Sequence, residues 1–562
     1  MNVLGLNYIF HDTASCIVSD GELAVAIEEE RLTRKKHTQS FPLESISACL
    51  LQTHLTPDDI EHVAVSVRPE KMLSEKLCYA AHLNGNSAPF LAYEFDRLRS
   101  RHLKFWSWFQ ATWPDPRHTP QVHFVEHHIA HAAGSYFVSP WRRAALLSVD
   151  GWGEWTTTWL GVATDSEIRC IGESSFPHSL GLFYSAATEF CGFQANFDEG
   201  KTMGLAPWGD ATRFYQTVAS MVAIDRFGSV TLDMSWFDHA ALGGRFFGEK
   251  FCSAFGASRA KGGPIEQHHK DVAAAFQAVL EDKLVSLCGV LERETDAEYL
   301  VMGGGVALNS VANGRVLRET RFRDMYVMPG SGDNGTCIGA AYQVFNGELR
   351  QQKRYHHNTP FLGREYADRE IKELLDECKL SYRRSSDICS ETARLLKDGR
   401  IVGWFQGRME FGARALGNRS ILADASIPGM KDRINSEVKH REAFRPFAPS
   451  VAVEHRDRYF DTHVDSPFML QVCPVLESAR CAIEAAVHVD GTARLQTVDR
   501  SINPRYHELL TRFGELSGHP VLLNTSFNVM DEPIVESPLH AVRCYFSTGL
   551  DNLVIGDYVI GK

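Results

Sequence analysis

Residues 3–31 read VLGLNYIFHDTASCIVSDGELAVAIEEER, and residues 144–163 repeat their pattern as AALLSVDGWGEWTTTWLGVA. In both stretches, short apolar runs alternate with Asp-Gly pairs or small polar residues, a pattern that predicts strands joined by tight turns. Two such stretches predict a duplicated core. Residues 271–288 have helical periodicity, and residues 298–317 predict a strand, a triple-glycine turn and a helix. The fold class is therefore predicted to be α/β.

Two histidines lie four residues apart in VEHHIAHAAGSYF at residues 125–137. On a helix, His127 and His131 share one face with Cβ atoms about 5–6 Å apart, so both imidazoles can reach one ion. Asp150 ends the strand that follows and Asp333 ends a second strand-like run, so two carboxylates can join them. This donor set favours iron, manganese or zinc over magnesium. The alternative is a histidine pair on a helix surface or hydrogen-bonded in the core.

The C-terminal third is rich in arginine and glycine. A predicted helix at residues 385–399 is followed by an apolar strand and by Gly- and Arg-rich turns up to residue 426. The guanidinium fork matches phosphate geometry, and glycine leaves the backbone accessible, so we predict phosphate binding here. The alternative is a solvated basic face. Phosphate is favoured because four basic residues are embedded among phenylalanines and a proline: Arg414, Lys439, Arg441 and Arg445.

Length, charge and cysteine content exclude several classes of protein. At 562 residues the chain is long enough for three or four lobes of roughly 150 residues. A net charge of −12 gives no electrostatic footprint for nucleic acid. The 13 cysteines form no CxxC pair, which argues against zinc fingers and a disulfide framework. No basic leader and no apolar run of about 20 residues is found, so we expect a cytoplasmic protein without a membrane partner.

A polar, basic stretch at residues 347–363, GELRQQKRYHHNTPFLG, interrupts the pattern of strands and helices. Such a stretch is typical of an interdomain connection. We therefore expect a first domain at residues 1–350, a connector at residues 351–365 and a second domain at residues 366–562.

A series of motifs, taken together, points to one family. They are NYIFHDTAS, RKKH, the His-x-x-x-His helix with SVDGWGE, DEGKTMGLAPWG, GGGVALNS, GSGDNGTCIGAA, GWFQGRMEFGARALGNRSIL, VKHREAFRPFAPSV, ARLQTV and LNTSFNVMDEPIVESP. In this order, and over essentially the whole chain, they resemble the NodU/CmcH-type O-carbamoyltransferases, which tailor antibiotics and nodulation factors.

The resemblance implies a fold and a two-step reaction. The first domain would have a duplicated actin-like ATPase fold, similar to the threonylcarbamoyl transferases that modify tRNA. The second would be a YrdC-like α/β lobe, similar to the enzymes that make carbamoyl-adenylate. Carbamoyl phosphate and ATP, with Mg, would give carbamoyl-adenylate and pyrophosphate. A hydroxyl of a small-molecule acceptor would then attack the carbamoyl carbon, and AMP would leave.

The resemblance also implies roles for individual residues. His11 matches the catalytic histidine of the family, and Lys36 in RKKH matches an acceptor contact. The four predicted metal ligands match the family's ligands, for which the family points to iron(II). The residues matched to ATP, carbamoyl phosphate or the adenylate are Gly151, Lys201, Gly304, Gly305, Asn309, Arg414, Lys439, Arg441, Arg445, Arg494, Ser526 and Asn528.

Three other classes are less consistent with the sequence. A tRNA threonylcarbamoyl transferase would share the histidine helix, but the net negative charge and the second domain argue against it. A hydrogenase-maturation carbamoyltransferase would carry paired CxxC motifs, which this chain lacks. A non-catalytic actin-like nucleotide-binding protein would have no use for the histidine pair or the arginines. The acceptor, and the choice between monomer and homodimer, stay open.

Overall fold

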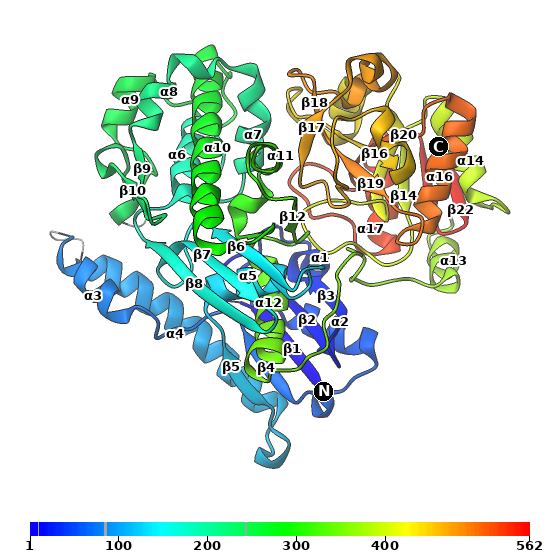
Figure 1. Cartoon of the computed structure of the whole chain (residues 1–562). Coiled ribbons are helices and arrows are strands. Elements are labelled where there is room, and N and C mark those ends of the chain that lie inside the picture. Colours follow the sequence, from blue (N-terminus) through cyan, green and yellow to red (C-terminus); the bar gives the residue numbers. More distant parts are fainter. Residues whose placement is uncertain (9, 84–86, 242–243) are drawn as a thin grey trace. The chain divides into compact units, whose positions relative to one another are not determined.

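The computed structural model describes residues 1–8, 10–83, 87–241 and 244–562, which form two compact units (Figure 1). Unit 1 comprises Met1–Glu29 and His37–His357, and unit 2 comprises Glu30–Lys36 and Asn358–Lys562. Both units combine helices and strands, which confirms the predicted α/β class. Within the described ranges, no helix is long and apolar enough to cross a membrane.

The first sheet of unit 1 contains the hairpins at the start of the chain. Its strand order is β3-β2-β1-β4-β5, with β1, β2 and β3 antiparallel and β1, β4 and β5 parallel. The strands are β1 (Asn2–Asn7), β2 (Ala14–Ser19), β3 (Glu22–Glu28), β4 (His62–Val65) and β5 (Gln121–Phe124). Most residues of β1 and β2 are buried, as expected for strands covered on both faces.

The second sheet of unit 1 has the same construction. Its order is β12-β11-β6-β7-β8, again with three antiparallel strands followed by two parallel ones. The strands are β6 (Arg143–Val149), β7 (Thr156–Thr164), β8 (Glu167–Ser175), β11 (Tyr299–Gly303) and β12 (Asp324–Val327). Because strand order and direction match those of the first sheet, the core of unit 1 is duplicated, as predicted.

The two Asp-Gly pairs that suggested this duplication do not occupy equivalent turns. The pair at residues 20–21 joins β2 to β3, whereas the pair at residues 150–151 follows β6 and opens the connection to β7. The counterpart of the β6–β7 connection in the first sheet is the β1–β2 connection, which carries His11 and Asp12. Each repeat therefore has polar residues in its first turn.

Two helices that follow the last strand of each sheet pack against each other. They are α5 (His127–Tyr136), after β5, and α12 (Thr336–Tyr342), after β12. Glycine permits the close crossing: a Cβ atom on Gly339 would lie 1.7 Å from the carbonyl oxygen of Ala130 on α5. The crossing brings the start of α12 beside the histidine face of α5.

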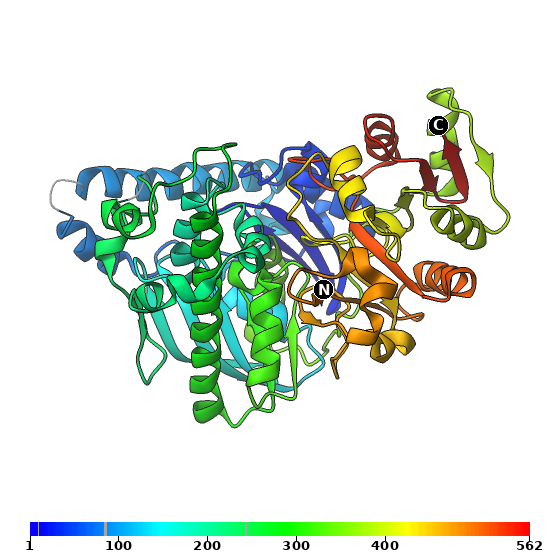
Figure 2. The ribbon, with the colours of Figure 1, turned by 90° about the horizontal axis from the view of Figure 1, so that it is seen from above.

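The remaining elements of unit 1 lie outside the two five-stranded sheets. The 29-residue helix α10 (Gln267–Thr295) packs on α6 and α11, and α3 lies beside α4 (Figure 1 and Figure 2). The other elements are α2 (Leu43–Thr53), α3 (Leu73–Ala81), α4 (Ser87–Thr112), α6 (Leu180–Phe190), α7 (Glu199–Leu205), α8 (Tyr215–Ala219), β9 (Val222–Ile224), β10 (Val230–Leu232), α9 (Glu249–Phe255) and α11 (Ser310–Glu319).

Unit 2 is built on an eight-stranded, mainly antiparallel sheet of order β13-β22-β21-β14-β15-β20-β16-β19. The strands are β13 (Arg383–Arg384), β14 (Val402–Phe405), β15 (Arg419–Asp424), β16 (Ala448–Ala452), β19 (Gln496–Val498), β20 (Val521–Ser526), β21 (Asn552–Ile555) and β22 (Tyr558–Gly561). A small second sheet pairs β17 (Val472–Pro474) with β18 (Thr492–Arg494). The principal helices are α13 (Asp368–Glu377), α14 (Ile388–Lys397), α15 (Met430–Arg433), α16 (Pro504–Ser517) and α17 (Pro538–Phe546).

The sheet of unit 2 separates two hydrophobic cores. Successive side chains of a strand point to opposite faces, so Trp404 packs with α14 and α16 while Phe405 joins the core on the other face. Between Glu348 and Asp368 the chain has neither helix nor strand. Residues 30–36, on the N-terminal side of the chain, group with unit 2.

Candidate active site

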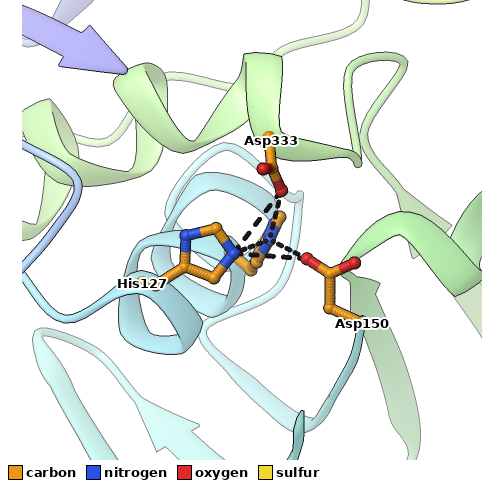
Figure 3. A group of neighbouring side chains, drawn as sticks. His127, Asp150 and Asp333 are labelled. Atoms are coloured by element: carbon orange, nitrogen blue, oxygen red, sulfur yellow. Dashed lines mark hydrogen bonds and ion pairs between the residues drawn. The ribbon is translucent and has the colours of Figure 1, made fainter. Parts of the chain in front are cut away.

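Two histidines of α5 and two aspartates form a compact cluster in unit 1 (Figure 3). His127 Nε2 and His131 Nε2 lie 3.0 Å apart, and Asp150 Oδ2 lies 3.2 Å and 3.0 Å from them. Asp333 Oδ1 lies 3.5 Å from His127 Nε2 and 3.7 Å from His131 Nε2. The structure therefore brings together the four residues that the sequence predicted to converge.

These separations suit a single transition-metal ion. Four ligand atoms placed tetrahedrally about 2.1 Å from a metal lie about 3.4 Å from one another. The histidine–carboxylate and histidine–histidine separations in the cluster run from 3.0 to 3.7 Å. Two imidazoles with two carboxylates are also the donor set expected for iron, manganese or zinc. The residues present therefore fit such an ion.

The cluster balances its own charge. Burial disfavours a charged His131 imidazole, but hydrogen bonds and attraction from Asp150 and Asp333 raise its pKa to about 9. Burial raises the pKa of Asp150, and its contacts with His127 and His131 outweigh this and lower the pKa well below its usual range. The raised pKa of His131 favours a proton where a metal would bind, so metal binding would release that proton.

Neighbouring turns hold Asp150 and the start of α5 in place. The backbone N–H groups of Gly151 and Gly305 donate to Asp150 Oδ1 at 2.8 and 3.2 Å. The buried Glu154 carboxylate accepts the backbone N–H of His127 at 3.0 Å, at the N-terminal end of α5. Gly304 has a positive φ of 86°, and a Cβ there would lie 2.2 Å from the carbonyl oxygen of Val149. The glycines predicted to approach the adenylate thus also support Asp150.

The histidine between the two candidate ligands has a different role. His128 contacts the Ser148 hydroxyl at 2.8 Å through Nδ1 and the Thr156 carbonyl at 2.9 Å through Nε2. Burial lowers the pKa of His128 well below its usual value. His128 is therefore the hydrogen-bonded core histidine that the sequence left as the alternative for its neighbours.

His11 lies at the edge of the cluster. Its Nε2 is 3.8 Å from Asp333 Oδ2, and its Nδ1 is 2.9 Å from Asp12 Oδ2. Burial lowers the pKa of His11, but the attraction of Asp333 and the hydrogen bond to Asp12 outweigh this and raise it to about 10. Asp12 also accepts from His37 Nδ1 at 2.8 Å. The first turn of each repeat thus contributes a side chain to this region: His11 from the first repeat and Asp150 from the second.

The two residues of unit 1 matched to the adenosine part have defined partners. Lys201 Nζ donates to Asp198 Oδ2 at 2.9 Å. Asn309 caps α11 by accepting the backbone N–H of Ala312 at 3.1 Å, and it exchanges hydrogen bonds with Gln277 at 2.9 and 3.1 Å. Asn309 therefore has a structural function, whatever it binds, and Lys201 is positioned through Asp198.

In unit 2 the structure brings Lys439 together with Ser526 and Asn528. The buried ammonium group of Lys439 donates to Asn528 Oδ1 at 2.7 Å, to the Asn528 carbonyl at 3.0 Å and to the Ser526 carbonyl and hydroxyl. All of these partners are neutral oxygens. Burial, and then repulsion from Arg441 and Arg445, lower the pKa of Lys439 well below its usual value.

Four arginines of unit 2 repel one another. Burial is the main cause of the lowered pKa values of Arg414 and Arg441, and repulsion from Arg445 adds to it. Together they lower the pKa of Arg414 to about 10 and that of Arg441 to about 9. Burial and the other three guanidinium groups lower the pKa of Arg494 well below its usual value. Arginine stays protonated in proteins, so these shifts express the cost of burying the charges and, after it, their mutual repulsion, both of which a bound anion would offset.

Arg419, another arginine of unit 2, has a purely structural role and differs in its hydrogen bonds from the four arginines of the cluster. Arg419 is fully buried and donates to five backbone carbonyls, at 2.6 to 3.4 Å. By contrast, the buried Nε atoms of Arg414 and Arg494 have no hydrogen-bond partner in the described structure. Unused donors in a cationic cluster are the arrangement expected of an anion site.

The loop that carries Arg414 is held by a buried glutamate. Glu410 Oε1 accepts the backbone N–H groups of Leu416, Asn418 and Arg419 at 2.8, 2.8 and 3.1 Å. Lys36 also belongs to unit 2, where its charge contributes to lowering the pKa of Lys439. The basic residue matched to an acceptor contact is thus placed with the cations of unit 2.

Comparison with known proteins identifies the family. Residues 2–342 match the carbamoyltransferase N-terminus model and residues 393–562 match the carbamoyltransferase C-terminus model. The chain is 37% identical to an uncharacterized protein of Synechocystis, over 100% of this chain and 97% of that one. It is 36% identical to nodulation protein NolNO of Sinorhizobium fredii, over 99% and 80%.

A third relative has an activity in its name. The chain is 32% identical to 3'-hydroxymethylcephem-O-carbamoyltransferase of Streptomyces clavuligerus, over 52% of this chain and 54% of that one. The chain therefore belongs to the carbamoyltransferase family, and it is a carbamoyltransferase enzyme.

Several residues at these sites were not predicted from the sequence. Asp12 and His37 lie inside two quoted motifs, so the motifs contained a signal for them. Glu154 and Glu410 act on backbone N–H groups that only the folded chain brings near. No spacing in the sequence indicates such contacts.

Proposed function

We propose that the protein is an ATP-dependent O-carbamoyltransferase with two chemical steps in two units. Unit 2 would make carbamoyl-adenylate from carbamoyl phosphate and ATP. Unit 1 would transfer the carbamoyl group to a hydroxyl of a small-molecule natural product. The observation that carries the proposal is the cationic cluster of unit 2, in a chain whose family is that of carbamoyltransferases.

The first step brings several anions together. Carbamoyl phosphate and water give carbamate and phosphate, and a carbamate oxygen then attacks the α-phosphorus of ATP, which releases pyrophosphate. Donors fixed in advance around such charge stabilise the transition state. The residues proposed for this task are Arg414, Lys439, Arg441, Arg445, Arg494, Ser526 and Asn528. The unused Nε donors of two of these arginines support the assignment.

The second step breaks the mixed anhydride. The acceptor oxygen attacks the carbamoyl carbon, the bond from that carbon to the phosphate oxygen breaks, and AMP leaves. His11 would take the hydroxyl proton or hydrogen-bond the carbonyl oxygen. His127, His131, Asp150 and Asp333 would hold an iron(II) ion, or manganese or zinc, which would polarise the anhydride when bound. Gly151, Lys201, Gly304, Gly305 and Asn309 would contact the adenosine part.

The two sheets of equal strand order support a duplicated actin-like ATPase fold for unit 1. For unit 2 we propose a YrdC-like lobe, on the basis of the Lys439–Ser526–Asn528 contact. The net charge of −12 favours a small-molecule acceptor over tRNA. We propose Lys36 as the acceptor contact.

Separate assays of the two steps test the proposal. Arg441→Ala and Lys439→Ala should lose pyrophosphate release from ATP and carbamoyl phosphate while retaining transfer from pre-made carbamoyl-adenylate. Transfer is followed with 3'-hydroxymethylcephem and a panel of glycosides as acceptors. The control is Arg512→Ala, a partly exposed arginine of α16 paired with Glu515, which should change neither activity. Equal loss of both activities in folded Arg441→Ala would contradict the two-site proposal.

A further inference from the structure

A chain of three side chains in unit 1 ends at His11. His37 Nδ1 contacts Asp12 Oδ1 at 2.8 Å, and Asp12 Oδ2 contacts His11 Nδ1 at 2.9 Å. Each oxygen of the Asp12 carboxylate thus contacts one imidazole. Since an ionised carboxylate only accepts hydrogen bonds, both Nδ1 atoms must be donors. The remaining nitrogen of His11, Nε2, lies on the side of Asp333, 3.8 Å from its Oδ2.

The backbone around this chain is strained and fixed. Asp12 and His37 have positive φ values of 51° and 53°, a conformation that costs a residue other than glycine about 1–2 kcal/mol. Asn7 Nδ2 donates to the carbonyl oxygens of His11 and Asp12 at 3.1 and 3.2 Å. Thr13 N donates to the Thr38 carbonyl at 3.3 Å, joining the two segments. Such strain persists where the surrounding structure over-determines a functional geometry.

Phe197 packs near both imidazoles of the His37–Asp12–His11 group. The Phe197 ring lies 4.8 Å from the His37 ring and 5.7 Å from the His11 ring, measured between centroids. The Asp12 side chain retains 26% exposure and those of His11 and His37 about one third, so the chain lies at the border of the buried cluster. Packing and hydrogen bonds thus restrict rotation of both imidazoles.

We propose that Asp12 and His37 are positioning residues that hold His11 with Nδ1 toward Asp12 and Nε2 toward the carbamoyl carbon. The inference rests on the proposed transfer step. There Nε2 of the neutral His11 imidazole accepts the acceptor hydroxyl proton while the acceptor oxygen forms a bond to the carbamoyl carbon and AMP departs. A cation held by Asp150 and Asp333 would offset the attraction that these carboxylates exert on a charged His11. Asp12 fixes which nitrogen carries the hydrogen, and His37 fixes Asp12. Neither residue touches the reacting atoms.

The decisive variant is Asp12→Asn, which keeps size and shape. An amide N–H turned toward Nδ1 would favour the tautomer with hydrogen on Nε2, so His11 could no longer accept a proton. We expect transfer to slow by roughly 10²- to 10⁴-fold in kcat, with the KM for the acceptor, the metal content and pyrophosphate release unchanged. The control is Asp20→Asn, an exposed aspartate that also has positive φ, in the β2–β3 turn.

Variants of His37 separate positioning from simple stability. His37→Asn retains a donor where Nδ1 stands and should stay within a few-fold of wild type. His37→Ala removes the donor and should lower kcat about 10-fold. Equal rates for His37→Asn and His37→Ala would overturn the role of His37, and a wild-type kcat for Asp12→Asn would overturn that of Asp12.

The same samples distinguish failure of this inference from failure of the proposed function. If wild type transfers no carbamoyl group from carbamoyl-adenylate to any acceptor, the proposed function fails. If wild type and Asp12→Asn transfer equally while His11→Ala does not, only the positioning inference fails. Loss of bound metal in Asp12→Asn would also overturn it, since Asp12 would then act through the metal cluster.

Discussion

The polar cluster of unit 1 and the cationic cluster of unit 2 differ in how their charges are compensated. In unit 1, two histidines face two carboxylates, and the carboxylates stabilise a charged His131. In unit 2, four arginines and a lysine repel one another, and within the described residues the buried Nε atoms of Arg414 and Arg494 have no hydrogen-bond partner. The first arrangement can exchange its protons for a cation, and the second requires an anion.

The two clusters also differ in the structures that carry them. The ligands of unit 1 lie at the ends of regular elements: the start of α5, the end of β6 and the turn before α12. Of the cations of unit 2, Arg414, Arg441 and Arg445 lie in turns, whereas Lys439 ends a short π-helix and Arg494 ends β18. The buried Glu410 fixes the turn of Arg414 through backbone hydrogen bonds. A metal needs ligands at fixed distances, whereas a polyphosphate can be bound by several flexible arginine side chains whose guanidinium groups each form bidentate hydrogen bonds.

Removing one metal ligand should have the largest effect on this contrast. We expect His131→Ala to lose most of the bound metal and to slow transfer by roughly 10³-fold, because several kcal/mol of stabilisation at the anhydride disappear. Pyrophosphate release by unit 2 should continue. Elemental analysis and the two assays check this. The control is the exposed His118→Ala, and an active, metal-free His131→Ala enzyme would exclude a metal-dependent transfer step.

Removing a cation from unit 2 should weaken binding of an anion without affecting the metal. Arg494→Ala should raise the Kd for pyrophosphate, used as the probe, by about 10²-fold, since hydrogen bonds to charged groups contribute about 1.5–3 kcal/mol. Pyrophosphate should raise the Tm of the wild type and hardly that of the variant. The structural Arg419 is no suitable control, so Arg512→Ala serves again. Unchanged pyrophosphate affinity in Arg494→Ala would mean that the cationic cluster is not its site.

The crossing of α5 and α12 offers a test of geometry alone. Gly339→Ala would place a Cβ 1.7 Å from the Ala130 carbonyl and push the helices apart. We expect a loss of about 1–3 kcal/mol in the free energy of unfolding, as for overpacked cores, and weaker metal retention. In Gly200→Ala on α7 the added Cβ meets nothing within 4 Å, and that variant should be as stable as wild type or more so. Equal metal retention in both variants would contradict a role for the crossing.

Much of this comparison was predictable from the sequence, for identifiable reasons. The spacing of His127 and His131 and the strand-end aspartates predicted the metal cluster, because helix and strand periods fix where such side chains point. The aromatic setting of Arg441 and Arg445 predicted a phosphate site. The meeting of Lys439 with Ser526 and Asn528 followed from family resemblance alone, since 87 residues separate Lys439 from Ser526.

Other features depend on the tertiary fold and left no local pattern. The duplicated core was predicted, but from Asp-Gly pairs that occupy different turns, because a dipeptide specifies a turn and not its place in the strand order. The grouping of residues 30–36 with unit 2 rests on contacts between distant segments. Arg34, for example, donates to the carbonyl oxygens of Pro533 and Ile534 at 2.6 Å.

The smallest expected effect concerns the glutamate behind the arginines. Glu410 Oε1 accepts three backbone N–H groups of the loop that follows Arg414, while Oε2 is buried and has no hydrogen-bond partner among the described residues. Glu410→Gln retains the shape but replaces charged hydrogen bonds with weaker neutral ones. We expect the KM for ATP and carbamoyl phosphate in pyrophosphate release to rise by several-fold to about 10-fold, with kcat and the metal content unchanged. The matched control is Glu508→Gln on α16, whose carboxylate lies near the partly exposed Arg512. A drop in kcat at unchanged KM would instead assign Glu410 to the chemical step, and unit 2 would then need a buried acid among its cations.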